Sequence, residues 1–336
     1  MNIRVAINGF GRIGRSVFRI LCDHPSIEVV CINDIFKNEA LAYLLKYDTI
    51  MGTLKQDVTH DDHALYVGGK KILMTSLRNP AEAKWKELGI DVVIESTGIF
   101  TARADLEKQL AAGAKRVLLT VPPKDNVDQM VVMGVNDDQL KPEHRLVSNA
   151  SCTTNCLAPL AKVLDDSFGI KHGIMTTVHA YTNDQRLADV PHEDFRRSRA
   201  AAENIIPTTT GAARAVGVVL PKLMGKLDGI AARVPVSDGS VVDLVVELEK
   251  HPDNEAINEA VRRAAQMIGI TNIREQQKLA TENLSSGNPA ARRIGVGFAI
   301  YCEQAAHGTS VYYGWGIPMA PGHAQCAARL TPDGVL

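Results

Sequence analysis

The chain has 336 residues, of which 45% are hydrophobic and 22% are charged, and its formal net charge is −1. These values are ordinary for a soluble globular protein, and the length favours two domains over one. A net charge near zero provides no field for holding nucleic acid or an anionic membrane. Because no apolar run is long enough to span a bilayer and no signal peptide precedes the first strand pattern, we expect a cytoplasmic protein.

Six cysteines are spread unevenly along the chain, which is not the pattern of a disulfide framework. A reducing compartment is therefore expected. Two of the cysteines, Cys152 and Cys156, lie four residues apart in the stretch SNASCTTNCLAP.

The first expected strand is IRVAI, residues 3–7, whose β-branched and apolar side chains suit a buried parallel strand. It runs into NGFGRIGR, where Gly9, Gly11 and Gly14 have the spacing G-x-G-x-x-G, and a helix pattern, SVFRILCDH, follows. In a dinucleotide-binding unit the first glycine allows a tight turn and the second lets a pyrophosphate approach the backbone. The third lets helix and strand pack closely, and the amides at the helix start face the phosphates.

A second strand pattern, EVVCIND at 28–34, ends in Asp34, about 20 residues after the last glycine. A carboxylate at this position accepts hydrogen bonds from an adenine ribose and would repel a 2′-phosphate. The glycines alone are compatible with a turn that binds no ligand. Together with both strands, the helix and the acid, they predict a nucleotide-binding domain that prefers NAD to NADP.

Two further strand patterns, DVVIESTG at 91–98 and KRVLLTVPP at 115–123, flank the helical stretch ADLEKQLAAGA. They predict a doubly wound parallel sheet, in which ligands bind beyond the carboxyl ends of the strands. Ser96, Thr97 and Thr120 are therefore candidates to line a cofactor groove, although any one of these hydroxyls alone is as well explained as a cap.

The cysteine pair is best explained as one nucleophile and one bystander. Zinc would require further Cys or His ligands at short spacing, and a redox pair typically has the spacing C-x-x-C. Cys152 follows a small polar stretch and precedes a helix pattern, so the helix dipole and free amides are expected to lower the pKa of its thiol. Cys156, one turn further and next to Leu157, is expected to be a packed small hydrophobe.

A thiolate nucleophile needs an acid–base partner, and His179, at the end of the strand pattern GIMTTVHAYTND, is the leading candidate. Basic and hydroxyl groups follow in FRRSRAAA, PTTTGAA and ARVPVSDGS. Arginines and threonines around an otherwise neutral site suit a phosphorylated substrate. For Arg196 we retain the simpler interpretation of a solvated surface residue.

Seven segments together resemble the phosphorylating glyceraldehyde-3-phosphate dehydrogenase family, and they span about residues 1–265. They are INGFGRIGR, LLKYDT, ESTGIF, SNASCTTNCLAP, HAYTNDQ, RAAAENIIPTTTGAA and GKLDGIAARVP. The resemblance implies an α/β chain with a Rossmann-type NAD-binding domain at 1–151. A catalytic α+β domain with a mostly antiparallel sheet would follow at 152–317, and an atypical tail at 318–336.

The resemblance also implies the role of each site residue. Cys152 is the nucleophile and His179 its base, and no metal is involved. The attacking inorganic phosphate is surrounded by Ser151, Thr153, Thr210 and Gly211, and the phosphate of the substrate is held by Thr182, Arg197 and Arg233. The positions that match the family's cofactor site are Gly9, Phe10, Gly11, Arg12, Ile13, Gly14, Asp34, Arg78, Ser96, Thr97 and Thr120.

The implied activity is the NAD-dependent oxidation of glyceraldehyde 3-phosphate, with inorganic phosphate, to 1,3-bisphosphoglycerate in glycolysis and gluconeogenesis. Cys152 would carry a thiohemiacetal and then a thioester, and the enzyme would be a homotetramer. Erythrose-4-phosphate dehydrogenase, from the same superfamily, is the nearest alternative, although HAYTNDQ and TTTGAA favour the three-carbon substrate. A weakly active NAD-binding scaffold is the alternative from another class.

The family pattern is lost near residue 270. The family has there a motif, Tyr-Asp-Asn-Glu-x-Gly-Tyr-Ser, whose asparagine orients the nicotinamide, and a long terminal helix follows. This chain instead ends in TSVYYGWGIPMAPGHAQCAARLTPDGVL, with Pro318 and Pro321 where that helix should begin. A rebuilt C-terminal segment and a shifted reading frame both account for this tail. Asp238-Gly239 is a smaller departure, since the family usually has Asn-Val there.

Overall fold

The computed structural model describes residues 2–267, which divide into two compact units. Among the described residues, the first unit consists of residues 2–132 together with residues 136–151. The second consists of residues 133–135 and 152–267. The tail expected at 318–336, and the C-terminal part of the expected catalytic domain, lie outside the described residues.

The helices of the first unit are α1 (Arg12–Leu21), α2 (Asn38–Lys46) and α3 (Arg103–Ala111), with the short 3-10 helices η1 (Pro80–Glu82) and η2 (Asp137–Gln139). Its strands are β1 (Ile3–Asn8), β2 (Ile27–Asn33), β3 (Tyr47–Asp48), β4 (Gly52–Thr53), β5 (Val58–His60), β6 (Ala64–Val67), β7 (Lys70–Thr75), β8 (Val92–Glu95), β9 (Arg116–Leu119), β10 (Gln129–Met130) and β11 (Leu146–Ser148).

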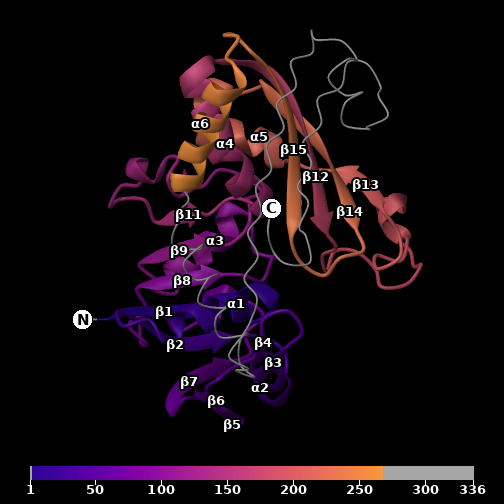
Figure 1. Cartoon of the computed structure of the whole chain (residues 1–336). Helices are drawn as coiled ribbons and strands as arrows, with labels where there is room; N and C mark the ends of the chain where they lie inside the picture. Colours follow the sequence, from indigo (N-terminus) through magenta and orange to yellow (C-terminus); the bar gives the residue numbers. More distant parts are fainter. Residues whose placement is uncertain (1, 268–336) are drawn as a thin grey trace, which may run out of the picture. The chain divides into compact units, whose positions relative to one another are not determined.

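Nine of these strands form one sheet in the order β10-β11-β9-β8-β1-β2-β7-β6-β5 (Figure 1). The strands from β10 to β7 are parallel to their neighbours, and β6 and β5 add an antiparallel edge. The order runs outward from β1 in both directions, so the topological switch point lies between β1 and β8, where sheets of this class bind ligands. The predicted doubly wound, Rossmann-type sheet is confirmed.

The apolar strand patterns are explained by burial on both faces of this sheet. Val5, Ala6 and Ile7 of β1 are all buried. On one face Val5 and Ile7 pack with Phe10, Phe18 and neighbouring residues of α2, and on the other Ala6 packs with Trp85 and its neighbours. A strand that is buried on both sides reads as a continuous apolar run, and this is why the sequence revealed it.

The first helix differs from its expected position. The pattern SVFRILCDH suggested a start near Ser16, whereas α1 begins at Arg12, directly after Gly11. It ends at Leu21, and the N–H of Cys22 donates to the carbonyl of Phe18 at 2.8 Å. The glycine turn therefore leads straight into the helix.

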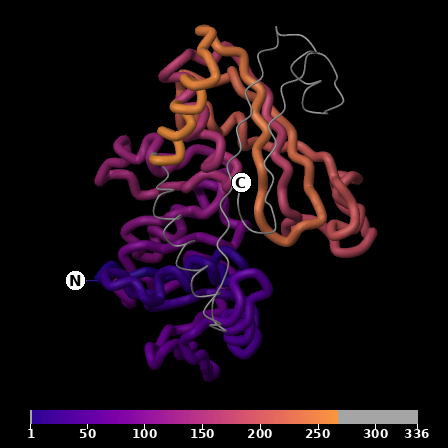
Figure 2. The backbone as a smooth tube through the Cα atoms, viewed as in Figure 1, coloured from indigo at the N-terminus to yellow at the C-terminus, as the bar shows by residue number. Residues whose placement is uncertain are grey.

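The second unit contains α4 (Cys152–Phe168), α5 (Ala212–Val219), α6 (Asn254–Met267), η3 (Phe195–Ser198) and η4 (Pro221–Leu223). Its strands are β12 (Ile170–Ala180), β13 (Ile206–Thr209), β14 (Leu227–Val234) and β15 (Ser240–Leu248). These strands form a sheet in the order β13-β14-β12-β15, in which β12 and β14 are parallel and the outer pairs are antiparallel. Two of the three strand pairs are antiparallel, which confirms the expected mostly antiparallel sheet. Strands β12, β14 and β15 run side by side as long extended segments (Figure 2).

The two faces of this second sheet differ. Side chains alternate along β12, so that Met175 and Thr177 are buried, whereas Ile174 is 65% exposed. Helix α4 packs on β12 and β15, and α5 on β14. The opposite surface, here called the open face, is formed by the exposed apolar side chains of Ile174, Val178, Ile230, Val241 and Val245.

Within residues 2–267, no helix has both the length and the apolar character that crossing a membrane requires.

Gly239, where the family pattern has a valine, has φ +88°, a backbone conformation that a β-branched residue rarely adopts. Its carbonyl accepts the N–H of Ala180 at 3.1 Å, so this turn lies directly against the end of β12.

Candidate active site

The three glycines of the expected nucleotide turn have different surroundings. Gly9 has φ +93°, and a Cβ there would lie 2.6 Å from the amide nitrogen of Thr97. A Cβ on Gly14 would lie 2.1 Å from the carbonyl oxygen of Gly9. Around Gly11, by contrast, no described atom lies within 4 Å of the added Cβ. The first and third glycines are thus required by the fold, and the second leaves open space at the start of α1, as a bound pyrophosphate would need.

Asp34 follows β2 and reaches back to the glycine turn. One carboxylate oxygen accepts the N–H of Phe10 at 2.6 Å, and the other accepts the N–H of Phe36 at 3.1 Å. Each oxygen has a further lone pair with which it could accept a ribose hydroxyl. The residues present therefore fit an NAD molecule, and Asp34 also holds the turn in place.

A buried polar network that the sequence patterns did not predict lies under the turn. Glu95, at the end of β8, is fully buried and accepts hydrogen bonds from the side chains of Asn8 at 2.5 Å and Gln109 at 3.1 Å. Asn33 donates to Asn8 at 2.7 Å, which extends the network across three strand ends. Burial raises the pKa of Glu95, while its hydrogen bonds, first among them that from Thr97, oppose the rise. The available sequence signal was a polar residue at the end of each apolar strand.

The hydroxyls expected to line a cofactor groove are engaged with the sheet. The Ser96 hydroxyl donates to the carbonyl of Gly9 at 2.7 Å, that of Thr97 to Glu95 at 2.5 Å, and that of Thr120 to the carbonyl of Glu95 at 3.0 Å. These bonds fix the strand ends around the switch point. Contact between these hydroxyls and a cofactor stays a prediction.

The remaining cofactor candidates lie at the surface, with one exception. Arg12, Ile13 and Arg78 are exposed, and Arg12 also forms an ion pair with Asp48 at 3.4 Å. The Phe10 side chain is fully buried and packs edge-to-face on Phe18. Any contact between Phe10 and a cofactor would therefore involve its backbone alone.

The second unit brings the two expected catalytic residues together. Cys152 is the first residue of α4, and His179 is the second-last residue of β12. The Cys152 Sγ lies 3.2 Å from the His179 Nε2, within hydrogen-bonding distance for sulfur. The sequence placed these residues in separate patterns, and the fold makes them a pair.

Each member of the pair shifts the pKa of the other toward the charged form. The pKa of Cys152 is lowered, chiefly by its hydrogen bond to His179 and also by bonds from the hydroxyl and amide of Thr153, although burial opposes this. The pKa of His179 is raised, chiefly by its hydrogen bond to Cys152, against burial and the charge of Arg233. A thiolate facing an imidazolium is the arrangement that activates a cysteine nucleophile.

The expectation that Cys156 is a packed hydrophobe is wrong. It is exposed, because residues four apart on a helix share a face and Cys156 lies on the same accessible face as Cys152. The pKa of its thiol is nevertheless raised, first by the protein atoms that displace water from around the sulfur and then by the charge of Cys152. Cys156 is accessible, but it is not activated.

Two helix N-termini meet beside the cysteine. The hydroxyl of Thr154 in the first turn of α4 donates to the carbonyl of Ala212, the first residue of α5, at 3.2 Å. Thr153 follows Cys152 in α4, and Thr210 and the exposed Gly211 directly precede α5. Helix N-termini carry partial positive charge and unpaired amides, so their convergence favours an anion here. Ser151 directly precedes α4.

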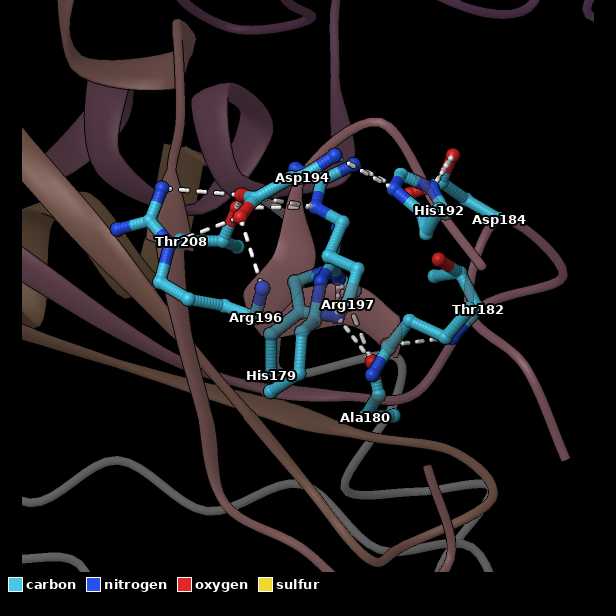
Figure 3. Close-up of polar contacts among 11 residues, drawn as sticks. His179, Ala180, Thr182, Asp184, His192, Asp194, Arg196, Arg197 and Thr208 are labelled. Atoms are coloured by element: carbon cyan, nitrogen blue, oxygen red, sulfur yellow. Dashed lines mark hydrogen bonds and ion pairs between the residues drawn. The ribbon is translucent and has the colours of Figure 1, made fainter. Parts of the chain in front are cut away.

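A network of charges surrounds Arg197, as Figure 3 shows. The Arg197 guanidinium donates to the Thr208 hydroxyl at 2.9 Å and pairs closely with Asp184. His192 lies 3.6 Å from the same Asp184 carboxylate, and its other ring nitrogen accepts the Asp194 N–H at 2.9 Å. Asp184, His192 and Asp194 were not predicted, because they come from a loop without periodicity.

Arg196 and Thr182 are neighbours of this network, and they differ in their contacts. Arg196 is exposed and pairs with Asp194 at 2.9 Å, in keeping with a solvated surface residue. The Thr182 N–H donates to the side chain of Gln185 at 3.1 Å. Thr182 and Arg197 both lie near the end of β12, which carries His179 and Ala180 (Figure 3).

Arg233 lies directly beside His179. Strands β12 and β14 are parallel, and their register pairs His179 with Arg233. The Arg233 Nη1 contacts the His179 Nδ1 and lies 3.3 Å from the carbonyl oxygen of Ala180. Its pKa is lowered by burial and by the charge of Arg197. No described ion pair includes Arg233, so its charge, unlike that of Arg197, has no carboxylate partner within residues 2–267.

The fold and the site define a class of protein. One unit carries a dinucleotide-binding sheet, and the other carries a cysteine–histidine pair with cations and helix N-termini suited to anions. This combination is that of a dinucleotide-dependent oxidoreductase acting on a carbonyl compound.

Comparison with known proteins identifies the family. Residues 3–103 match the family described as glyceraldehyde 3-phosphate dehydrogenase, NAD binding domain, and residues 151–289 match its C-terminal domain. The glyceraldehyde-3-phosphate dehydrogenase of Streptomyces coelicolor is 60% identical over 267 residues, 79% of each chain. That of Geobacillus stearothermophilus is 56% identical, also over 79% of each chain. Glyceraldehyde-3-phosphate dehydrogenase 2 of Bacillus subtilis is 52% identical over 84% of each chain.

The chain therefore belongs to the glyceraldehyde-3-phosphate dehydrogenase family and is an NAD-dependent oxidoreductase. The family match ends at residue 289, beyond the last quoted motif, GKLDGIAARVP, which ends at residue 235.

Proposed function

We propose that this chain catalyses the phosphorylating oxidation of D-glyceraldehyde 3-phosphate to 1,3-bisphosphoglycerate. The observation that supports this most directly is the 3.2 Å contact between the Cys152 Sγ, at the start of α4, and the His179 Nε2. The names of the relatives point to the same substrate, and the paired helix starts and arginines are suited to phosphate groups.

In the first half-reaction, the Cys152 thiolate adds to the aldehyde carbon and the His179 Nε2 proton passes to the carbonyl oxygen. The product is a thiohemiacetal, whose hydroxyl lies within reach of the now neutral Nε2. NAD, when bound, supplies the acceptor for the hydride that leaves the carbon. His179 takes back the hydroxyl proton as the hydride leaves, and a thioester on Cys152 results.

In the second half-reaction, an oxygen of inorganic phosphate attacks the thioester carbonyl. The backbone amide of Cys152 and the His179 imidazolium are suited to stabilise the oxyanion that forms. Collapse of this intermediate releases the Cys152 thiolate and an acyl phosphate. Because Thr153, Thr210 and Gly211 lie at the two helix starts beside Cys152, we assign the attacking phosphate to them, together with Ser151.

We assign the phosphate of the substrate to Thr182, Arg197 and Arg233, which lie near the end of β12. Guanidinium groups donate two hydrogen bonds to phosphate oxygens, and each charge-assisted bond contributes about 1.5–3 kcal/mol. The proposal includes a cytoplasmic location and assembly into a homotetramer.

A spectrophotometric assay of NADH formation tests this function. With glyceraldehyde 3-phosphate, NAD and inorganic phosphate, we expect sustained NADH formation. Without phosphate, we expect a burst of about one NADH per site, because the thioester is not cleared. Erythrose 4-phosphate should give a lower kcat/KM, and the reverse order would favour the four-carbon alternative. No NADH from either aldehyde, with an unreactive Cys152, would instead indicate an NAD-binding scaffold.

A further inference from the structure

The carboxylate of Glu95, at the end of β8, accepts four hydrogen bonds. Its Oε1 accepts the N–H of Thr97 at 2.9 Å and the hydroxyl of Thr97 at 2.5 Å. Its Oε2 accepts the side-chain amides of Asn8 at 2.5 Å and Gln109 at 3.1 Å. Glu95 is fully buried, and no ion pair described within residues 2–267 includes it. Its charge is therefore stabilised by hydrogen bonds and not by a cation of this part of the chain.

One branch of this network, here called the turn branch, runs through Asn8 and Asn33 at the ends of β1 and β2. The N–H of Leu77, which can only donate, bonds to the Asn33 Oδ1 at 2.8 Å. The amide nitrogen of Asn33 therefore faces the Asn8 Oδ1, at 2.7 Å, and the amide nitrogen of Asn8 faces Glu95. Each side-chain amide of the turn branch is thus oriented so that its donor points toward the carboxylate.

The other branch, here called the helix branch, runs through Gln109 of α3. The Trp85 Nε1–H, which can only donate, bonds to the Gln109 Oε1 at 2.6 Å, so the Gln109 amide nitrogen faces Glu95. All the partners of Glu95 are therefore donors, as an ionised carboxylate requires. Burial raises the pKa of Glu95, but the usual pKa of a carboxyl group lies well below neutral pH, and these bonds favour the charged form.

The turn branch, unlike the helix branch, adjoins the expected cofactor site. Each of its members directly precedes an expected cofactor residue in the chain. The pairs are Asn8 and Gly9, Asn33 and Asp34, Leu77 and Arg78, and Glu95 and Ser96. The carbonyl of Asn33 also accepts the N–H of Gly9 at 2.8 Å, and the carbonyl of Asn8 accepts the N–H of Ser96 at 2.8 Å. Trp85 of the helix branch instead packs in the apolar cluster that contains Ala6 and Ala83.

We propose that Glu95 is a positioning residue for NAD. Its carboxylate holds the end of β8 and, through the turn branch, the ends of β1 and β2. The glycine turn and Asp34 then have their binding arrangement before the cofactor arrives. A site that is ordered in advance loses less conformational freedom on binding, so it binds its ligand more tightly. The proposal concerns the binding of NAD and does not depend on which aldehyde is oxidised.

Glu95→Gln tests the need for an acceptor on both carboxylate oxygens, because it replaces one oxygen by an amide group at nearly constant size. The new donor would face either the N–H of Thr97 or the amides of Asn8 and Gln109, whose directions are fixed. We expect NAD to bind about 10-fold more weakly or worse, the equivalent of one lost hydrogen bond to a charged group. Calorimetric titration of the full-length chain, well below the melting temperature of the variant, measures this. Wild-type affinity would overturn the proposal.

Asn8→Leu and Gln109→Met form a matched pair of further variants. Each removes one donor to the same Glu95 oxygen and replaces a buried amide by an apolar side chain of similar size. Both should lower the melting temperature, since each leaves a buried polar group without its partner. Only Asn8→Leu, in the turn branch, should weaken NAD binding by about 10-fold, and Gln109→Met should stay within about twofold of the wild type.

This pair decides the proposal even if Glu95→Gln does not fold. NAD affinities that fall together with the melting temperature in both branches would overturn it, because Glu95 would then stabilise the fold without a separate effect on the cofactor site.

Hydrogen–deuterium exchange without cofactor reports on the turn itself. The N–H of Phe10 donates to Asp34 at 2.6 Å, so its exchange rate shows whether the turn is in place. The rate should be higher than in the wild type in Glu95→Gln and Asn8→Leu, and unchanged in Gln109→Met. Weakened NAD binding with unchanged exchange would overturn the proposal, since the turn would then be held without Glu95. Neither measurement involves an aldehyde, so a failure of the proposed function would leave both results unaffected.

Discussion

Cys152 and Cys156 have the same chemistry and lie one turn apart on α4, so the difference between them must come from their surroundings. His179 lies 3.2 Å from the Cys152 sulfur and lowers the pKa of that thiol, whereas the pKa of Cys156 is raised. We expect Cys152→Ser to abolish NADH formation while NAD binding is retained, because a serine hydroxyl is not ionised by this histidine. Cys156→Ser should keep most of the activity.

Steady-state assays and calorimetric titration with NAD check both variants. Cys156→Ser is the matched control, since it makes the same change on the same helix face. Equal loss of activity in the two variants would contradict the assignment of one nucleophile and one bystander.

The pH dependence of thiol alkylation gives a second prediction at the residue scale. A lowered pKa keeps Cys152 in the reactive thiolate form at pH values below the usual range of a thiol, and its reactivity is lost only as the pH falls through the lowered pKa. Rates of modification by iodoacetamide, measured in Cys156→Ser, should therefore fall off at a lower pH than for an ordinary cysteine. His179→Gln removes the main cause of the shift and should move the midpoint upward. An unchanged midpoint would show that His179 does not activate the thiol.

At the scale of elements, two glycines of the turn between β1 and α1 are expected to have different roles. Gly14 is needed for the fold, and Gly11 for NAD binding. A Cβ on Gly14 would lie 2.1 Å from the Gly9 carbonyl, whereas one on Gly11 would meet open space. We expect Gly14→Ala to destabilise the fold by more than about 2 kcal/mol, because backbone must move. Gly11→Ala should leave the melting temperature nearly unchanged but weaken NAD binding by about 10-fold or more, since its methyl group fills the space a pyrophosphate needs.

Thermal melts and NAD titrations of the two variants check this. They form a matched pair, since each adds one methyl group within the same turn. Gly11→Ala with wild-type NAD affinity would mean that the pyrophosphate does not approach this glycine.

The elements also explain what the sequence revealed and what it did not. Strands β1 and β2 and the glycine turn were predictable because burial on both faces and φ restrictions leave local marks. Helical periodicity places Cys156 on the same face as Cys152, but it does not show whether other residues cover that face. The prediction that Cys156 is buried was therefore wrong. The burial of Glu95 could not be predicted, because an acidic residue at a strand end has the same sequence pattern whether it is buried or solvated. Asp184 pairs with Arg197, and His192 lies beside Asp184, through the path of a loop, and a loop path leaves no repeating pattern.

At the scale of the whole molecule, the second sheet presents apolar side chains on the side opposite its helices. On this open face Ile174 and Val245 are register partners in β12 and β15, 65% and 44% exposed, and Ile230 is 52% exposed. A contiguous exposed apolar surface commonly marks a protein interface, and a symmetric assembly buries the same surface on both copies. We therefore expect the open face to form a contact between copies of this chain in the proposed homotetramer.

Sedimentation equilibrium of the full-length protein should give about four times the chain mass of 36.4 kDa. Because Ile174 and Val245 oppose each other across two strands, replacing both with lysine would place two charges of the same sign in each copy of the contact. Burying unpaired charges is costly, so the double variant should sediment as smaller species. Ile20→Lys changes an exposed residue of α1 in the first unit, 69% exposed, and should leave the mass unchanged. A monomeric wild type would refute the assembly, and a double variant of unchanged mass would place the contact elsewhere.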